Sequence, residues 1–296
     1  MSRSGLFNIA LWTSCLTSKA HLGASLSPSE RLSSLYRIEV HRPHPRTEET
    51  AIRHCEDLEL FLGHETIAAH TQAAFSQAQA FVDAFYSVRS PSRKLVVLDS
   101  GCGTGKSTLT LAARHPGLPV IGIDRSFVRL SRNAKFRHEM DGSEGDPSLP
   151  NLIFVRADLI DFFLLALHQR DWIIHSHYLL YPNPYPKSKH LKRRFHGHPI
   201  LPVMLALGGQ LILRSNWFVY LQEFEMALNA INRKYLTGSE FEFNCLAMPL
   251  ISLFPMTNFE RKYSLAELPL YELQADMGIR DHSGRMSFLS SLTIDR

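Results

Sequence analysis

The residues with the clearest chemical potential lie in the stretch K-L-V-V-L-D-S-G-C-G-T-G-K-S-T-L, residues 94–109. An apolar run, Leu95–Leu98, is followed by the acid Asp99, and then glycines alternate with other residues at Gly101, Gly103 and Gly105. Glycines so placed allow a tight turn without Cβ clashes, so a ligand can approach backbone N–H groups at the start of the next helix. The stretch predicts a small-molecule site at the carboxyl end of a first β-strand.

Two ligand classes use such a turn, phosphate groups and adenosine cofactors. A phosphate-binding loop has the pattern G-x-x-x-x-G-K-[ST]; Gly105, Lys106 and Ser107 fit its end, but Ser100 stands where its first glycine belongs. The carboxylate of Asp99 would also repel a triphosphate, whereas it could accept hydrogen bonds from an ammonium group. A P-loop NTPase is therefore the weaker alternative.

A second acid, Asp124, ends the next predicted strand, Val120–Ile123. A carboxylate in this position commonly accepts the ribose hydroxyls of an adenosine cofactor. NAD would use it too, but the NAD fingerprint G-x-G-x-x-G places its third glycine one residue later than Gly105. The pattern Asp-x-Gly-x-Gly-x-Gly with a second acid 25 residues beyond the first favours S-adenosylmethionine. Dinucleotide-binding and purely structural interpretations stay open.

Two further segments follow strand ends and should face the same crevice, because ligands of open α/β sheets lie beyond the carboxyl ends of the strands. Asp158 follows the strand Leu152–Val155 and could meet the adenine amine or cap a helix over Leu159–His168. After the strand Trp172–Tyr178 comes the loop Y-P-N-P-Y-P, residues 181–186, which its prolines stiffen.

The proline-rich loop leads into a dense run of basic residues, namely Lys187, Lys189, His190, Lys192, Arg193 and Arg194. Such a run is often only a solvated helix face. Beside a rigid loop that carries Asn183 and Tyr185, it favours a polyanionic substrate, because each cation can neutralise a phosphate. The net charge of +4 permits a nucleic-acid partner without requiring one.

The elements that must position these residues alternate as in a doubly wound α/β domain. Apolar runs predict seven strands, over Leu95–Leu98, Val120–Ile123, Leu152–Val155, Trp172–Tyr178, Gly209–Arg214, Phe241–Met248 and Leu268–Ala275. Helical spacing covers Thr50–Val88, Ser107–Arg114, Ser126–Met140 and Leu159–His168.

Composition narrows the class of protein. A chain of 296 residues with 45% hydrophobic content is enough for one α/β core with an appendage. Its apolar runs are too short to span a membrane. The four cysteines, Cys15, Cys55, Cys102 and Cys245, are scattered and form no C-x-x-C. We therefore expect no disulfide framework, no metal site and a reducing interior.

The two ends of the chain differ from its middle. Residues 1–29 are serine-rich and lack acids, which is typical of a chloroplast or mitochondrial transit peptide, or of a disordered extension on a cytoplasmic protein. A His/Arg/Pro segment at Arg37–Arg46 reads as an exposed docking or linking segment. We expect an extension over 1–45, a catalytic domain with a leading helix over 46–276, and a tail over 277–296.

The motifs D-S-G-C-G-T-G, G-I-D, R-A-D, P-N-P-Y-P-K-x-x-H-x-x-R-R, L-G-G and T-N-F-E together resemble the tRNA (guanine-N(7))-methyltransferase family, over Lys94 to Asp276. The resemblance implies a Rossmann-like class I methyltransferase with a mainly parallel seven-stranded sheet and helices on both faces. It also implies S-adenosylmethionine as cofactor and a guanine in the variable loop of tRNA as target.

Residue types and resemblance together assign roles. The cofactor is assigned to Asp99, Gly101, Gly103, Gly105, Asp124, Asp158 and Asn183. The tRNA is assigned to Lys187, Lys192, Arg193, Arg194, Asn216, Thr257, Asn258, Phe259 and Glu260, with Asn183 and Glu260 as catalytic residues. No membrane partner is expected, and the sequence identifies neither a protein partner nor a homodimer.

Two positions depart from the family pattern, since Asn183 and Asn216 stand where aspartates are usual. Guanine N(7) carries a free lone pair, so its methylation needs no general base but only alignment and tolerance of the charge that develops. An amide oxygen can still accept from the base, and losing one charge-assisted contact costs about 1.5–3 kcal/mol. Glu260 could supply the missing charge. We therefore expect an active, divergent enzyme.

Two alternatives stay open beside the P-loop interpretation. Asn-Pro before an aromatic residue is also found in methyltransferases that act on exocyclic amines of nucleic-acid bases, although Tyr185 and Pro186 stand here in the opposite order. A catalytically silent RNA-binding homologue is the other.

Overall fold

The computed structural model describes residues 27–36, 38, 40–64, 66–88, 91, 93–132 and 149–293. The transit peptide or disordered extension expected over residues 1–29 lies almost wholly outside the described residues. So does the second half of the helix expected over Ser126–Met140, of which α7 (Phe127–Leu130) is described.

The core of the protein is one seven-stranded sheet in the order β3-β2-β1-β4-β5-β7-β6. Its strands are β1 (Lys94–Ser100), β2 (Val120–Asp124), β3 (Leu152–Arg156), β4 (Trp172–Leu180), β5 (Gln210–Ser215), β6 (Cys245–Leu250) and β7 (Leu270–Asp276). The first five run parallel, and β7 lies antiparallel between β5 and β6. The expected mainly parallel α/β sheet is confirmed. Strand order reverses between β1 and β4, which is where such sheets open a ligand crevice.

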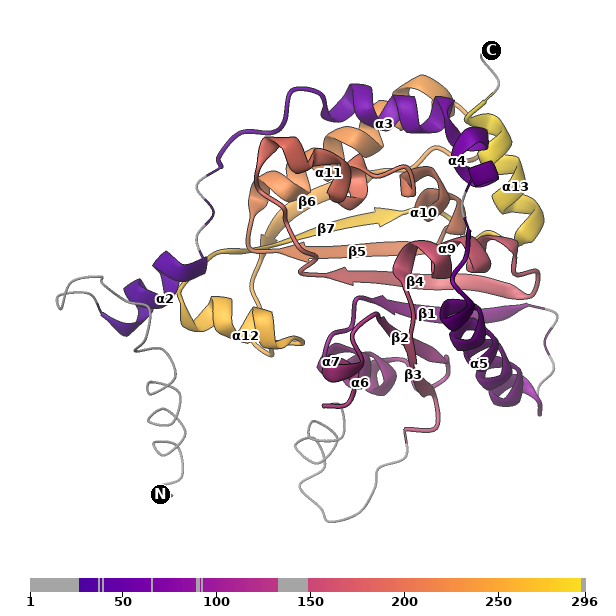
Figure 1. Ribbon diagram of the computed structural model, residues 1–296, viewed down its shortest axis with the longest axis horizontal. Helices are drawn as coiled ribbons and strands as arrows, with labels where there is room; N and C mark the ends of the chain where they lie inside the picture. Colours follow the sequence, from indigo (N-terminus) through magenta and orange to yellow (C-terminus); the bar gives the residue numbers. More distant parts are fainter. Residues whose placement is uncertain are drawn as a thin grey trace.

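Helices cover both faces of the sheet (Figure 1). One face carries α5 (Ala69–Tyr86), α9 (Leu159–His168), α10 (Leu201–Leu207), α11 (Phe218–Ile231) and α13 (His282–Ser291). The other carries α6 (Lys106–Arg114), α7 and α12 (Asn258–Leu265). The strands in the middle of the sheet are apolar on both faces because both faces are covered.

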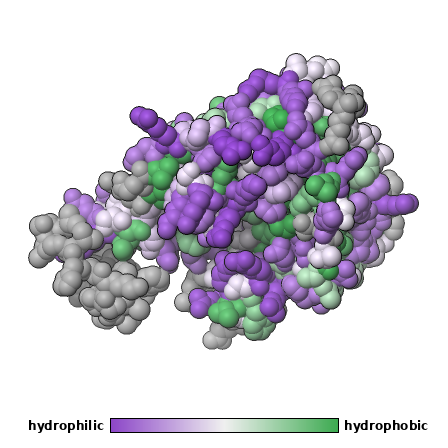
Figure 2. Space-filling model, turned by 45° about the horizontal axis from the view of Figure 1, so that its top comes forward, coloured by the Kyte–Doolittle hydropathy of each residue, from purple (hydrophilic) through white to green (hydrophobic). Residues whose placement is uncertain are grey.

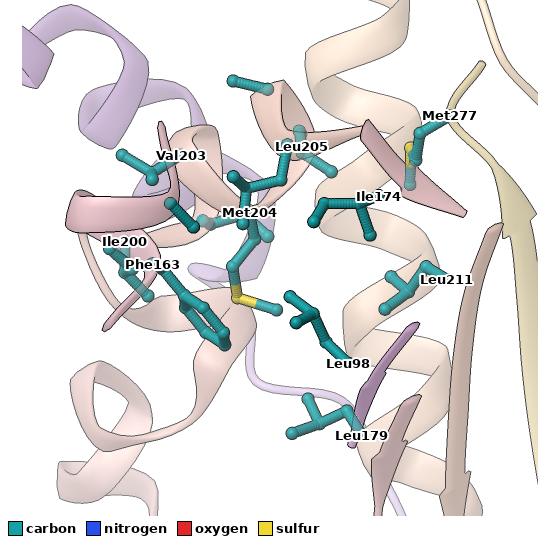
Figure 3. Close-up of a cluster of buried hydrophobic side chains, with 14 of the residues drawn as sticks. Leu98, Phe163, Ile174, Leu179, Ile200, Val203, Met204, Leu205, Leu211 and Met277 are labelled. Carbon is teal, nitrogen blue, oxygen red and sulfur yellow. The ribbon is translucent and has the colours of Figure 1, made fainter. Parts of the chain in front are cut away.

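The larger hydrophobic core lies between the sheet and the first of these helical layers. Figure 3 shows Met204 of α10 and Phe163 of α9 pointing toward Leu98 of β1. Leu98, Phe163 and Leu179 are each at most 1% exposed. This packing fixes the strands whose carboxyl ends carry the candidate site residues.

The single helix expected over Thr50–Val88 is instead three helices, α3 (Thr47–Glu56), α4 (Leu58–His64) and α5. The chain breaks after α3 because that helix packs on α11, whereas α5 packs on β1, β3 and α9. Before α5, the extended residue Ala68 donates its N–H to Asp161 Oδ2 (2.9 Å), which ties the turn to α9. Helical spacing alone does not reveal this change of direction.

The segment before α3 docks on the domain. Helix α2 (Pro28–Tyr36) lies against α12, beside the edge where β4 and β5 end (Figure 1). Trp217 Nε1 donates to the carbonyl of Val40 (2.7 Å), and the N–H of His44 donates to Glu223 Oε1 (2.7 Å). The docking segment expected at Arg37–Arg46 therefore has partners on α11 and just before it.

The C-terminal residues, expected as a tail, also belong to the packed domain as far as residue 293. In α13, Phe288 is fully buried, and the buried Arg285 donates to the carbonyls of Ala166 (2.7 Å) and Gln169 (2.9 Å) at the end of α9. The boundary expected at residue 276 is not a structural boundary.

The surface seen in Figure 2 is mostly hydrophilic, with small separate hydrophobic patches. Among the described residues, no helix has the length and apolar character needed to cross a membrane. Within the same residues no cluster of His, Cys, Asp and Glu side chains could hold a metal ion.

Candidate active site

The glycine turn after β1 has the backbone that its composition predicts. Gly101, Gly103 and Gly105 all adopt left-handed conformations, with φ of 80°, 61° and 83°. The N–H groups of Gly101 and Cys102 donate to the carbonyl of Ile123 (2.8 and 3.0 Å), which folds the turn over the end of β2. A Cβ added to Gly103 would meet no atom within 4 Å. The turn therefore faces open space in which a ligand can approach its backbone.

Asp99 lies at the end of β1 with only 1% of its surface exposed. Ser107 Oγ and Thr108 Oγ1, from the first turn of α6, both donate to its Oδ2 (2.6 and 2.7 Å). Its Oδ1 is buried and has no hydrogen-bond partner among the described residues. Burial raises the pKa of this carboxyl to about 6. A buried acceptor without a partner is uncommon, and it fits a cofactor that brings a cationic donor.

Asp124 lies at the end of β2 and holds the glycine turn in place. Its Oδ2 accepts from the N–H of Gly103 (3.0 Å), while its Oδ1 accepts from the N–H of Ser126 (2.7 Å) and contacts Arg129 (3.0 Å). Each carboxylate oxygen can accept more than one hydrogen bond, so ribose hydroxyls remain compatible with this arrangement.

Asp158 follows β3 and is the N-cap of α9, where its Oδ1 accepts from the N–H of Ile160 (2.9 Å). The expected capping role is confirmed, and the contact with adenine stays a prediction. Asp99 and Asp124 thus lie at the ends of β1 and β2, and Asp158 follows β3, so the three acids lie at the carboxyl ends of three adjacent strands.

The loop after β4 contains two strained residues. Tyr181 and Tyr185 have φ of 55° and 44°, which bulky side chains rarely adopt. Asn183 is exposed between them, and its Oδ1 accepts from the N–H of Tyr185 (3.3 Å). The N–H of Tyr181 donates to the carbonyl of Arg214 on β5 (2.8 Å). The loop therefore presents Asn183 in a fixed position at the expected crevice.

Arg194 does not fit its expected role as a substrate contact. Its side chain is 2% exposed, pairs with the buried Glu223, and lies 5.1 Å from the ring centre of Trp217. Its Nε and Nη2 donate to the carbonyl of Tyr185 (3.2 and 3.1 Å), and Nη2 also donates to that of Pro186 (3.3 Å). Arg194 therefore positions the strained loop from inside the protein.

Other members of the basic run do face solvent. Lys187, Lys192 and Arg193 are exposed, on or just before the short helix η1 (Ser188–Arg193), which the buried Leu191 anchors. The guanidinium of Arg193 lies 5.8 Å from the ring centre of Tyr185. These cations can reach a polyanion that lies along the proline-rich loop.

The T-N-F-E segment starts α12 next to the glycine turn. Thr257 is the N-cap of α12 and accepts from the N–H of Glu260 (2.9 Å). Asn258 Nδ2 donates to Thr104 Oγ1 inside the turn (3.3 Å), and Phe259 is 48% exposed. Segments more than 150 residues apart in the sequence therefore meet at one place, as the resemblance implies.

Glu260 is not available to a base in this structure. It is fully buried, pairs with Arg214 Nη1 (3.2 Å), and accepts from the N–H of Met256 (3.0 Å). The idea that it replaces the missing aspartate charge at the target does not fit this position. Asn216 is half-buried, and its Nδ2 donates to the carbonyl of Tyr36 in α2 (3.3 Å). The tRNA contact of Asn216 stays a prediction.

Sequence reasoning missed the residues that support the site from behind, chiefly Glu223 and Trp217. Glu223 lies within the apolar helix α11 and Trp217 immediately precedes that helix, and the sequence gives no sign of the partners of either residue. The hydroxyls that hold Asp99 could have been found, because Ser107 and Thr108 occupy the first turn after the glycines.

Comparison with known proteins agrees with this geometry. Residues 93–273 match the family model described as "Putative methyltransferase". The tRNA (guanine-N(7)-)-methyltransferase of Brevibacillus brevis is 25% identical over 222 residues, covering 71% of this chain and 96% of that protein. That of Enterococcus faecalis is 30% identical over 190 residues, covering 60% of this chain and 78% of that protein.

A solved structure described as "Structure of an Antibiotic Related Methyltransferase" matches with a TM-score of 0.44 at 14% identity, covering 72% of this chain and 97% of that chain. The family model alone spans more than half of the chain, and its range contains the glycine turn, the proline-rich loop and the T-N-F-E segment. The chain therefore belongs to the tRNA (guanine-N(7))-methyltransferase family of class I methyltransferases.

Proposed function

We propose that this protein transfers a methyl group from S-adenosylmethionine to N(7) of a guanine in the variable loop of tRNA. The observation that carries the proposal is the meeting of three segments at one sheet edge: the glycine turn, the loop that presents Asn183, and the start of α12 at Asn258. The hydrogen bond from Asn258 to Thr104 ties the last of these to the first.

The residues at the sheet edge suit the cofactor. The cofactor supplies a methyl group on a sulfonium and also carries an ammonium group. The free Oδ1 of Asp99 can accept from a cationic donor, and the glycine turn leaves room for a ligand against its backbone. Asp124 and Asp158 lie on the side of the next two strands, where the adenosine would extend.

The chain's own residues need to align the reactants and not to remove a proton. N(7) of guanine carries no proton at neutral pH, so a general base is unnecessary. Asn183 is held at the exposed tip of its loop and can accept from the N–H edge of the base. Since Glu260 is committed to Arg214, the amide is the acceptor that the loop offers.

The test is incubation of the purified full chain with bulk tRNA and radiolabelled S-adenosylmethionine, followed by nucleoside analysis. Label in 7-methylguanosine is expected. Label in an amino-methylated base would move the assignment to the exocyclic-amine alternative. Cofactor binding without label would indicate a silent RNA-binding homologue.

We also propose that residues 1–29 direct the protein to a chloroplast or mitochondrion, on the ground of their serine-rich, acid-free composition. A fluorescent protein fused to the C-terminus should enter an organelle with the full chain and stay in the cytosol when residues 1–29 are removed. Cytosolic fluorescence from the full-length fusion would contradict the proposal.

A further inference from the structure

A cavity lies between the start of α9 and the segment that follows the proline-rich loop. Its volume is about 400 Å³, and it is lined by Ile160, Tyr185, Lys192, Arg193, Phe195 and His198. This volume is within the range of about 300–1,000 Å³ that is usual for small-ligand sites. None of the cofactor contacts proposed above belongs to this lining.

The lining combines flat apolar surface with positive charge. Ile160, Tyr185 and Phe195 offer faces for an aromatic ring, while Lys192 and Arg193 are exposed cations. Neither cation has an ion pair with a carboxylate within the part of the chain that the structure describes. A cationic sulfonium cofactor would be repelled here. A nucleotide, with an aromatic base and a phosphate, matches both features.

His198 also lines the cavity, with an imidazole ring that can donate a hydrogen bond. Its Nδ1 accepts from the N–H of Ile200 (3.1 Å), and burial lowers the pKa of the ring, so the neutral form carries its proton on Nε2. An Nε2–H can donate to a base carbonyl or to a ring nitrogen.

The walls of the cavity are held from inside the protein. The carbonyl of Tyr185 accepts two hydrogen bonds from buried Arg194, and the N–H of Phe195 donates to the hydroxyl of Tyr220 (3.4 Å). Preorganised walls reduce the entropy cost of ordering them around a ligand.

The position of the cavity links it to the reaction. Ile160 is two residues beyond Asp158, and Tyr185 is two residues beyond Asn183, so the cavity adjoins both loops of the proposed site. A nucleotide bound there would be a close neighbour of the base that is being methylated.

We infer that this cavity binds a second nucleotide of the substrate RNA, adjacent in the chain to the methylated guanine, with its base against Tyr185 and Phe195 and its phosphate at Lys192 and Arg193. This inference rests on the proposed function, because it assumes an RNA substrate at Asn183. It adds a pocket that recognises the nucleotide next to the methylated guanine and so contributes to substrate specificity.

The test measures equilibrium binding of the full chain to a tRNA with a guanine in its variable loop, in the presence of S-adenosylhomocysteine, by fluorescence anisotropy. Two further tRNAs lack the base on the 5′ or the 3′ side of that guanine. One of these deletions should weaken binding by about 10-fold, which is the scale of one base stacked on aromatic side chains.

Variants locate the lost contact. Ile160→Trp fills the cavity and should weaken binding of intact tRNA by a similar factor. The affinity of this variant should not fall further when the same base is deleted, because the substitution and the deletion remove one interaction. Arg193→Gln, at an exposed position that does not threaten folding, should weaken binding of the intact and the base-lacking tRNA alike, because the phosphate that it contacts stays in place when the base is removed. Lys189→Gln is the matched control, since it removes a cation of the same helix outside the cavity lining; it should keep the full deletion penalty and weaken tRNA binding less than Arg193→Gln does.

An equal deletion penalty in all four proteins, or no penalty in the wild type, would overturn the inference. Formation of 7-methylguanosine in the same RNAs is measured separately. Binding penalties as expected without 7-methylguanosine would refute the proposed function and leave the cavity assignment standing, and the reverse pattern would do the opposite.

Discussion

Arg193 and Arg194 are adjacent in the basic run, but their substitution should have different effects on stability and on tRNA binding. Arg193 is exposed, whereas Arg194 is 2% exposed and pairs with Glu223, which is 1% exposed. Removing Arg194 would leave the Glu223 carboxylate buried with His196 and the N–H of His44 as partners. Breaking a buried pair in this way costs about 3–5 kcal/mol.

We therefore expect Arg194→Ala to lower the free energy of unfolding by about 3–5 kcal/mol, and Arg193→Ala to change it by less than about 0.5 kcal/mol. Urea unfolding followed by circular dichroism measures both. Arg194→Lys keeps the charge but not the forked contact with the loop carbonyls, so it should fall between them.

The two variants should also differ in which step of the reaction they impair, methyl transfer or tRNA binding. Without Arg194, the carbonyls of Tyr185 and Pro186 lose the donors that hold the loop. Arg194→Ala should therefore reduce kcat for methyl transfer at temperatures where it is folded, while Arg193→Ala should weaken tRNA binding and lower its salt dependence by about 0.7 per lost phosphate contact. Equal stability of the two variants, or an effect of Arg194→Ala on the salt dependence alone, would refute the reasoning.

Three further changes test the cofactor side and the target side of the site. Gly103→Val should abolish S-adenosylhomocysteine binding in calorimetry with tRNA affinity nearly intact, because valine at φ 61° is strained and would fill the open space before the turn; retained cofactor binding would count against this site. The pKa of Asp99 is raised to about 6, so the folded protein holds a proton there that the unfolded chain has released; stability from this group should fall as pH rises from about 4 to 6, and Asp99→Asn should remove that slope in urea unfolding at several pH values. If an ammonium binds the ionised carboxylate, cofactor affinity should rise as pH rises through about 6, and a flat profile would argue against that contact. Asn183→Asp should keep or raise guanine methylation, since it restores a charge at the target, and a reduced rate would favour an amide that reads an amine.

Much of the fold could be predicted from the sequence because its central strands are buried on both faces. Runs such as Leu95–Leu98 and Val120–Ile123 are short and apolar without alternation, as strands buried on both faces are, and their length and the glycines near them favour strands over helices. The acids that end these strands, Asp99 and Asp124, could be placed at one edge for the same reason, since parallel strands end together.

The burial of individual charges could not be predicted in the same way. Arg193 and Arg194 are equivalent by sequence, and their difference depends on Glu223 and Trp217, which follow in a different element. Glu260 matches the resemblance as well as Asn258 does, but an ion pair with Arg214 removes it from the crevice. Such pairings arise from tertiary packing, and local spacing carries no record of them.

The most direct test of N(7) as the target uses two tRNAs that differ at one atom. One carries guanosine at the methylated position in the variable loop, and the other carries 7-deazaguanosine, in which a carbon replaces N(7). We expect the full chain to transfer label from S-adenosylmethionine to the first tRNA and not to the second, with similar affinity for both. Equal labelling of the two tRNAs would show that the methyl group goes to a different atom.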